Sequence, residues 1–368
     1  MRFVVAQRSS RRGEGLGNEL LPWAKGWIAS QQLDAHLVGP SWGLNRRQYF
    51  RNFQTTRLDF ILEDALRRLP HSAFTEADYR ATGEIDFGAA IAKWAYQRHL
   101  NERSHFIVTV EGMAGGYAGI RRARPFLWSK LLASRDALRN LDWTLSRLDR
   151  RKLFVAVHLR SGCSEFAQHA THGDLRGKFN VSIPADWYRW VCESLTAAFG
   201  ERLQFWFFTD TRTAEFEEVA RRFNPGQLEP QGLSACSDLL LMAMADIRVC
   251  SISSYSMAAC YLADGPYIWY EPQLTLRNGL YSLWGHEKGQ QSASSPTKQS
   301  ESFVANIGRS PACVNFAGTA MDIGDSLPAQ LVQLLEQRLR GKDPRTNLLE
   351  YGCIPIKPVA GSCLNAAV

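Results

Sequence analysis

The sequence predicts an α/β protein with two domains, each built around a parallel sheet. Its 368 residues exceed what one hydrophobic core usually organises, so two cores are expected. The chain opens with a strand, a glycine-bearing turn, a helix and a second strand, which is the order that begins a parallel sheet. A second series of alternating strands and helices starts at Leu153.

The first domain is expected to occupy residues 1–150. A Val-rich strand over Arg2–Gln7 leads into the polar turn Ser9–Gly17. A helix over Asn18–Leu33 is predicted because apolar residues recur there at helical spacing. The other expected elements are a strand at Ala35–Val38, helices near Leu58–Leu69 and Ala89–Leu100, a strand at His105–Val110 and a helix over Trp128–Leu148. The charged run Asp149–Lys152 marks the junction with the second domain.

The second domain is expected to occupy residues 151–285. The nearly continuous apolar run Leu153–Leu159 is typical of a strand buried on both faces. Ser182 or Asp186 is expected to serve the first turn of a helix at Pro184–Phe199. The remaining expected elements are strands at Leu203–Phe208, Ile247–Ser251 and Tyr267–Tyr270, and helices at Thr213–Phe223, Ser237–Ala245 and Ser256–Ala263.

Residues 286–368 are predicted to form a C-terminal extension. Its segment 288–302 is rich in Ser, Gln and Lys and is expected to be a flexible surface loop. A late amphipathic helix is expected over Leu327–Leu339, and a loosely ordered tail is expected from Asn347 onward.

Composition favours a folded, soluble, cytoplasmic protein with reduced thiols. Hydrophobic residues make up 45% and charged residues 21%, which excludes disorder along the whole chain. No apolar run approaches the roughly 18–20 residues of a membrane helix, no secretion signal is visible, and the eight cysteines are scattered. The net charge of +7 is too mild to indicate nucleic-acid binding. It suits phosphate-rich ligands, peripheral contact with an anionic membrane, or simply an ordinary basic enzyme.

Two loops beyond predicted strands stand out as ligand candidates. In the first, Gly15, Gly17 and Asn18 open a helix, where glycine lets the backbone approach a phosphate or a sugar. This turn lacks the P-loop and dinucleotide-binding patterns, so it could simply join a strand to a helix. In the second, the guanidinium of Arg160 can grip a pyrophosphate and Gly162 lets the loop bend toward it. The alternative there is a surface arginine beside a satisfied His158.

Three further clusters place polar residues beyond strands of the second domain. They contain Asp210, Asp238 and the hydroxyls of Ser253, Ser254 and Ser256. Serines between a strand and a helix suit phosphate oxygens, although each alone is more often a helix cap. Their repetition in one domain favours a nucleotide site.

The order of these motifs resembles the superfamily of α1,2-, α1,6- and protein-O-fucosyltransferases. The motifs are a glycine–Asn turn, H-x-R-x-G, F-x-T-D, S-D-L-x-x-M and S-S-x-S, spread from about residue 1 to residue 285. The spacing around His158–Cys163 is also similar to that of rhizobial nodulation α1,6-fucosyltransferases. The resemblance implies the GT-B fold, in which two Rossmann-like domains face each other across a cleft. It also implies an inverting, metal-independent hexosyltransferase that moves fucose from GDP-fucose to a hydroxyl of a glycan or a small molecule.

The resemblance also implies roles for individual residues. Arg160 would hold the donor pyrophosphate and stabilise the departing GDP, while His158 would support that loop or contact the nucleotide. Asp238 would lie near the base. The other expected donor-binding residues are Gly15, Gly17, Asn18, Gly162, Asp210, Ser253, Ser254 and Ser256. Two departures, Cys163 where the family often has Asp and Tyr255 where it often has Phe, leave a GDP-sugar other than fucose open.

The chemistry of sugar transfer points to two catalytic candidates. Cleavage of the sugar–phosphate bond places negative charge on the leaving diphosphate, and without a metal an arginine must stabilise that charge, which favours Arg160. The acceptor hydroxyl can require a general base. Glu165, five residues beyond Arg160, is the best candidate for that base, and His169 and Asp174 are weaker candidates. Alternatives are that Glu165 is a solvated loop acid, and that a highly dissociative transition state needs no strong base.

The acceptor is not readable from the sequence. The arginines and tryptophans that could line an acceptor groove are Arg121, Arg122, Arg124, Trp23, Trp27 and Trp42, although most tryptophans belong to cores. A non-catalytic protein that binds a nucleotide sugar is the main alternative function. A sulfotransferase-like enzyme is disfavoured by the missing P-loop pattern.

Overall fold

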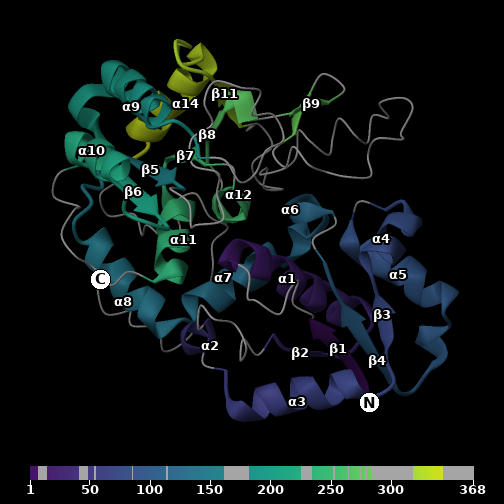
Figure 1. Cartoon of the computed structure of the whole chain (residues 1–368). Coiled ribbons are helices and arrows are strands. Elements are labelled where there is room, and N and C mark those ends of the chain that lie inside the picture. The colour runs from purple at the N-terminus through teal and green to yellow at the C-terminus, as the bar shows by residue number, and fades with distance from the viewer. Residues whose placement is uncertain are drawn as a thin grey trace. The chain divides into compact units, whose positions relative to one another are not determined.

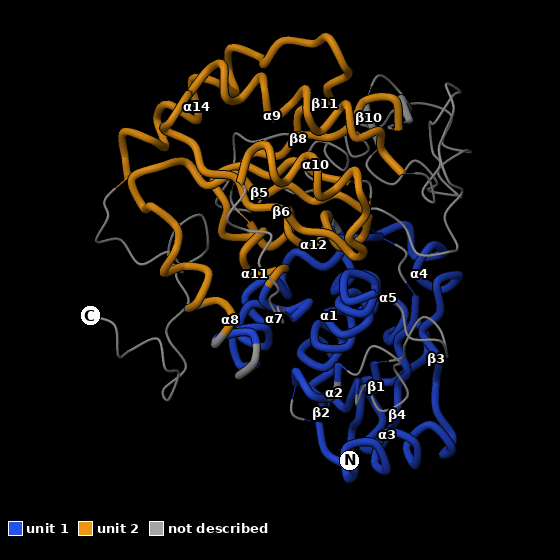
Figure 2. The backbone as a smooth tube through the Cα atoms, turned by 60° about the vertical axis from the view of Figure 1, so that its left-hand side comes forward, with its two compact units in different colours: residues 1–139, 234–237, 356–368 blue, residues 140–233, 238–355 orange. Residues whose placement is uncertain are grey.

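The computed structural model describes thirteen stretches of the chain. They are residues 1–6, 15–40, 49–53, 55–84, 86–112, 115–160, 182–224, 234–251, 253–263, 265–273, 275–277, 280–282 and 318–342. The chain divides into two compact units, coloured separately in Figure 2. Unit 1 comprises Met1–Arg139, Ser234–Ser237 and Ile356–Val368, and unit 2 comprises Asn140–Leu233 and Asp238–Pro355.

Unit 1 contains a four-stranded parallel sheet in the order β2-β1-β4-β3 (Figure 1). Its strands are β1 (Arg2–Ala6), β2 (His36–Val38), β3 (Ser72–Phe74) and β4 (Phe106–Val110). Its helices are α1 (Leu16–Gln32), α2 (Tyr49–Asn52), α3 (Arg57–Arg68), α4 (Glu76–Thr82), α5 (Phe87–Gln97), α6 (Gly116–Gly119) and α7 (Arg124–Leu132), and α8 (Arg135–Leu145) leads into unit 2.

Local sequence explains several of these elements. Helix α1 packs closely on β1 because Gly26 has no side chain there; a Cβ at that position would lie 2.9 Å from the Cβ of Ala6. Helices α3 and α4 each begin with a Thr-x-x-Asp capping box, in which Thr56 pairs with Asp59 and Thr75 pairs with Asp78. These boxes satisfy N–H groups that a helix start otherwise leaves unpaired.

Unit 2 contains a five-stranded parallel sheet in the order β11-β8-β7-β5-β6. Its strands are β5 (Leu153–Leu159), β6 (Leu203–Thr209), β7 (Ile247–Cys250), β8 (Tyr267–Tyr270) and β11 (Thr319–Met321). A separate antiparallel pair is formed by β9 (Thr275–Arg277) and β10 (Leu280–Ser282). The helices are α9 (Ala185–Phe199), α10 (Ala214–Phe223), α11 (Ala235–Met244), α12 (Ser254–Leu262) and α14 (Ala329–Arg340).

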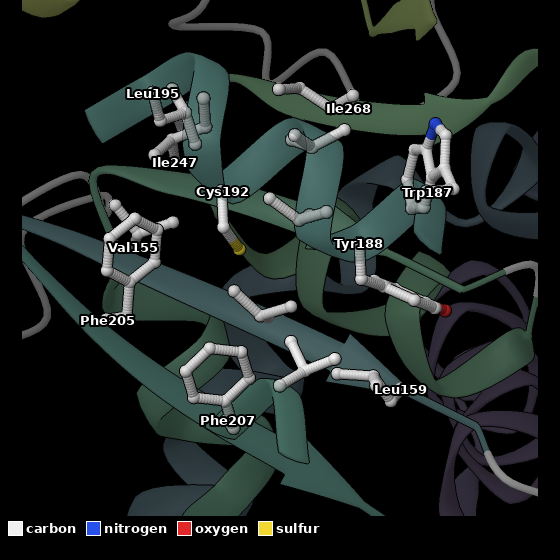
Figure 3. Close-up of a cluster of buried hydrophobic side chains, with 14 of the residues drawn as sticks. Val155, Leu159, Trp187, Tyr188, Cys192, Leu195, Phe205, Phe207, Ile247 and Ile268 are labelled. Atoms are coloured by element: carbon white, nitrogen blue, oxygen red, sulfur yellow. The ribbon is translucent and has the colours of Figure 1, made fainter. Parts of the chain in front are cut away.

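Helices cover both faces of the unit 2 sheet. Side chains alternate between faces along a strand, so Val155, Val157 and Leu159 share one face of β5 and pack there in one core with α9, α10 and α14 (Figure 3). His158 points to the other face, where its ring contacts Ser256 at the start of α12. On that same face Arg248 of β7 bonds to the carbonyl end of α11.

The predicted fold class is confirmed: the chain is α/β, with parallel sheets of four and five strands. The proposed facing of two domains across a cleft stays a prediction. The single helix expected over Trp128–Leu148 is wrong, because α7 ends at Leu132 and α8 begins at Arg135, with Ser134 Oγ accepting a bond from Ala137 N–H in the new first turn. Of the two residues expected to serve the first turn of α9, Asp186 lies in that turn, and the N-cap residue is Pro184.

Several elements of the described stretches were not expected, namely α2, β3, α4, α6, β9, β10 and β11. The predicted loop 288–302 and the tail from Asn347 lie outside the described residues. Among the helices of the described stretches, none combines the length and apolar character needed to cross a bilayer.

Candidate functional site

The strand order of unit 2 predicts where a ligand binds. From β5 the chain passes to β6 on one side of β5, and later strands β7 and β8 lie on its other side. In open parallel sheets, ligands bind beyond the carboxyl ends of the strands at the point where the order reverses. In this sheet that point lies between β5 and β7. Arg160 follows β5 there, and the serines from Ser251 onward follow β7.

His158 links the ends of these two strands. Its Nδ1 lies 2.7 Å from Oγ of Ser256 and 2.9 Å from Oγ of Ser251. Burial, with a smaller contribution from the charge of Arg160, lowers the pKa of His158 to about 3. The imidazole is therefore neutral near pH 7, and its contacts connect the end of β5 to the serine turn.

The serine turn presents the start of α12 to this edge. Ser253 is the N-cap, and its side chain accepts a bond from Ser256 N–H at 3.2 Å. The hydroxyls of Ser251, Ser253 and Ser256 thus make bonds within the protein, which leaves the helix start itself as the feature suited to an anion. Ser251 was expected as the last residue of a strand and was not among the predicted ligands. Its contact with His158 depends on strand pairing, which the sequence does not reveal.

Arg160 and Asp210 meet at the same edge of the sheet. Arg160 Nε lies 3.8 Å from Asp210 Oδ2, and the two side chains are 31% and 33% exposed. An ion pair this long and this exposed contributes little to stability. About a third of each side chain is open to solvent at this edge.

Asp238 lies in the first turn of α11, a helix that runs antiparallel to the strands and so begins at the carboxyl edge. The side chain is half-buried, but its Oδ1 is enclosed and has no hydrogen-bond partner among the described residues. Burial raises its pKa from 3.8 to about 7. Asp238 can consequently change its protonation state near neutral pH when a ligand approaches.

The remaining residues predicted to bind the donor either belong to unit 1 or lie outside the described residues. Gly15 is the N-cap of α1 in unit 1, with Asn18 in the helix that it opens, and the carbonyl of Gly17 accepts a 2.7 Å bond from Tyr117. Gly162, Cys163, Glu165, His169 and Asp174 lie outside the described residues, and so does Trp42.

The acceptor candidates in unit 1 are mostly engaged in packing. Trp23 is buried, with its ring edge-on to Phe53 and Phe126, and Trp27 stacks on Phe126 at 5.2 Å. Arg124 is buried and Arg122 pairs with Asp86 at 2.8 Å. Arg121 is half-buried and stays a candidate.

Unit 1 also holds a buried lysine that sequence reasoning missed. Lys25 Nζ donates to the carbonyl of Gly112 just beyond β4 and lies over the rings of Tyr79 and Phe87 at 5.6 and 5.4 Å. Burial lowers its pKa to about 7. Among the described side chains, no three His, Cys, Asp or Glu residues gather as a metal site would require.

Comparison with known proteins gives distant structural neighbours. No protein-family model and no curated protein matches the chain. A crystal structure of POFUT1 in complex with GDP-fucose matches with a TM-score of 0.41 and 12% identity, covering 73% of this chain and 98% of that one. The E. coli heptosyltransferase WaaC with ADP matches with a TM-score of 0.34 and 14% identity, covering 93% of this chain and 100% of that one. Identity and TM-score are both low, so these likenesses establish no family for this chain.

Proposed function

We propose that this protein is an inverting, metal-independent glycosyltransferase. It would transfer a sugar, in the first instance fucose, from a GDP-sugar to a hydroxyl of a glycan or a small molecule. The observation that carries the proposal is the polar edge of unit 2, where Arg160 and the start of α12 follow β5 and β7 on either side of the strand-order reversal. An arginine and a helix N-terminus together suit a diphosphate.

Arg160 would stabilise the transition state. As the sugar–phosphate bond breaks, negative charge grows on the diphosphate, and a planar guanidinium can meet two of its oxygens at once. His158 would act indirectly: because it is neutral and bonded to Ser251 and Ser256, it fixes the serine turn relative to Arg160 without adding charge.

Asp238 would recognise the base. A carboxylate accepts N–H bonds, and guanine offers two adjacent N–H donors on its Watson–Crick edge, which uracil and adenine do not. Because the pKa of Asp238 is raised to about 7, a base that donates to the carboxylate would also favour its ionised form. Glu165 is the proposed general base. Gly15, Gly17, Asn18 and Gly162 are proposed to approach the donor.

A thermal-shift screen with GDP, UDP, ADP and their sugars tests the donor class without knowledge of the acceptor. A ligand that binds only the folded state raises the melting temperature, and GDP and its sugars are expected to raise it most. Equal shifts with all three nucleotides would remove the base-specific role of Asp238.

A turnover assay with the stabilising GDP-sugar, run with and without EDTA, tests the reaction itself. Activity is expected to survive chelation. Loss of activity that Mn²⁺ or Mg²⁺ restores would contradict a metal-independent reaction. Stabilisation by GDP without turnover of any GDP-sugar would favour a non-catalytic nucleotide-sugar-binding protein.

A further inference from the structure

Tyr188 of α9 is a buried tyrosine with an unusual environment. Only 2% of its surface is exposed, and its ring packs edge-on against Trp187 with centroids 4.9 Å apart, inside the core between α9 and the sheet. Figure 3 shows the ring extending in the direction of the β5 arrowhead, near Leu159. The ring therefore belongs to the core, but the hydroxyl lies at the carboxyl edge.

The hydroxyl of Tyr188 is enclosed without a hydrogen-bond partner among the described residues. The titratable groups that act on it electrostatically are Cys250, the last residue of β7, and Asp210, the first residue after β6. It thus lies among the strand ends that carry the proposed donor site. A buried hydroxyl without a partner destabilises the fold by about 1–3 kcal/mol, so its presence calls for an explanation.

The chemistry of this hydroxyl favours an anionic acceptor. Burial raises the pKa of Tyr188 well above its usual value, with smaller effects from Cys250 and Asp210. The phenol therefore stays protonated at neutral pH, so it can donate a hydrogen bond but cannot serve as a base. A bond from a neutral donor to a charged oxygen is stronger than one to a neutral oxygen.

We propose that the Tyr188 hydroxyl donates a hydrogen bond to a phosphate oxygen of the nucleoside diphosphate. Tyr188 approaches this edge from the α9 face of the sheet, whereas His158 and Ser256 approach from the α12 face. With Arg160 between them at the end of β5, the diphosphate would be held from both faces of one sheet. This inference rests on the proposed function.

The test compares Tyr188→Phe with Tyr267→Phe. The first variant loses only the hydroxyl oxygen at the carboxyl edge. The second is a matched control, since Tyr267 is equally buried but is the first residue of β8, at the opposite edge. Binding of GDP is measured by calorimetry, and the melting temperature is measured without nucleotide. Tyr188→Phe is expected to weaken GDP binding roughly ten-fold or more. Its melting temperature should be unchanged or slightly higher, and Tyr267→Phe should bind GDP as the wild type does.

Each contrary outcome has a distinct meaning. If wild type and Tyr188→Phe bind GDP equally, the inference falls and the proposed function stands. If Tyr188→Phe melts at a clearly lower temperature without nucleotide, its hydroxyl has a partner within the protein and the inference also falls. If the wild type binds no GDP at all, the proposed function is wrong, and this inference, which depends on it, is wrong as well.

Discussion

Among the described residues, buried charged side chains make more hydrogen bonds and ion pairs within the protein at the amino edge of the unit 2 sheet than at its carboxyl edge. At the amino edge, Asp246 Oδ2 accepts a bond from Phe154 N–H at 2.6 Å and lies 2.7 Å from Lys342 Nζ, whereas its Oδ1 is enclosed without a hydrogen-bond partner among the described residues. Nearby, Arg248 donates to the carbonyls of Met242, Ala243, Ala245 and Pro266. At the carboxyl edge, the Tyr188 hydroxyl and the inner oxygen of Asp238 are enclosed and make no hydrogen bond with any residue of the described stretches, and Arg160 Nε lies 3.8 Å from Asp210 Oδ2.

We propose that this difference separates structural polar groups from groups that a ligand completes within one sheet. Bonded, buried charges hold strands and helices together, and removal of one partner leaves the other uncompensated. Groups that are enclosed but unbonded weaken the folded state, so they are expected where a ligand supplies the missing partner. Substitutions at the amino edge should therefore mainly lower stability, whereas substitutions at the carboxyl edge should mainly change ligand binding or turnover.

Asp246→Asn should give the largest loss of stability. The amide keeps an acceptor for Phe154 N–H but removes the negative charge that lies 2.7 Å from the buried ammonium of Lys342. The free energy of unfolding should fall by about 3–5 kcal/mol, measured by urea denaturation. Glu193→Gln is the control, because it breaks an exposed pair with Arg222 and should change stability by less than about 1 kcal/mol. Equal effects of the two variants would contradict a structural amino edge.

Arg160→Lys should reduce turnover far more than it reduces stability. Lysine keeps the charge but loses the two-point grip on the diphosphate, a loss of roughly 2–4 kcal/mol, or about 30- to 1000-fold in kcat/KM. The melting curve should correspond to a change within about 1 kcal/mol. Arg189→Lys, on the exposed face of α9, serves as the control with wild-type kinetics expected. If Arg160→Lys keeps more than about a third of the wild-type kcat/KM, Arg160 is not the diphosphate ligand.

Asp238→Asn should have a smaller effect of opposite sign to Asp246→Asn. The folded-state pKa of Asp238 is raised from 3.8 to about 7, so its carboxylate costs stability progressively as the pH rises through that window. Without nucleotide, the variant should therefore exceed the wild type by about 1–2 kcal/mol near pH 8, and the difference should shrink toward pH 5. Its preference for GDP over ADP should also fall. A variant less stable than wild type at pH 8 would place Asp238 among the structural carboxylates.

Much of the fold was predictable because most of its longer strands are continuous apolar runs in the sequence. The run Leu153–Leu159 is almost wholly apolar, and it forms a strand with those same bounds, as does Tyr267–Tyr270. The missed strand β11 has only the three residues Thr319–Met321, too few to show a period, and it is a strand only because β8 lies beside it. The break between α7 and α8 was missed because Ala133 and Ser134 are compatible with a continuing helix.

The site was less predictable than the fold. Position after a strand was enough to select Arg160, Asp210 and the serine turn as candidates on one sheet edge. It could not show that Ser253 caps α12 or that Ser256 bonds to His158, because both depend on distances across the folded chain. Tyr188 carried no signal at all, since a tyrosine on an apolar helix face is indistinguishable from ordinary core until the direction of its hydroxyl is known.

The late segment that completes the unit 2 sheet limits how this half of the protein can be exchanged with another. Strand β11 lies parallel to β8, the indole of Trp187 donates to the carbonyl of Met321, and Leu331 and Leu335 of α14 fill the same core as α9. A hybrid protein that contained only residues 151–285 of this chain would leave that core open on one side. An exchange of unit 2 between proteins must therefore transfer residues 318–342 together with the strands that precede them.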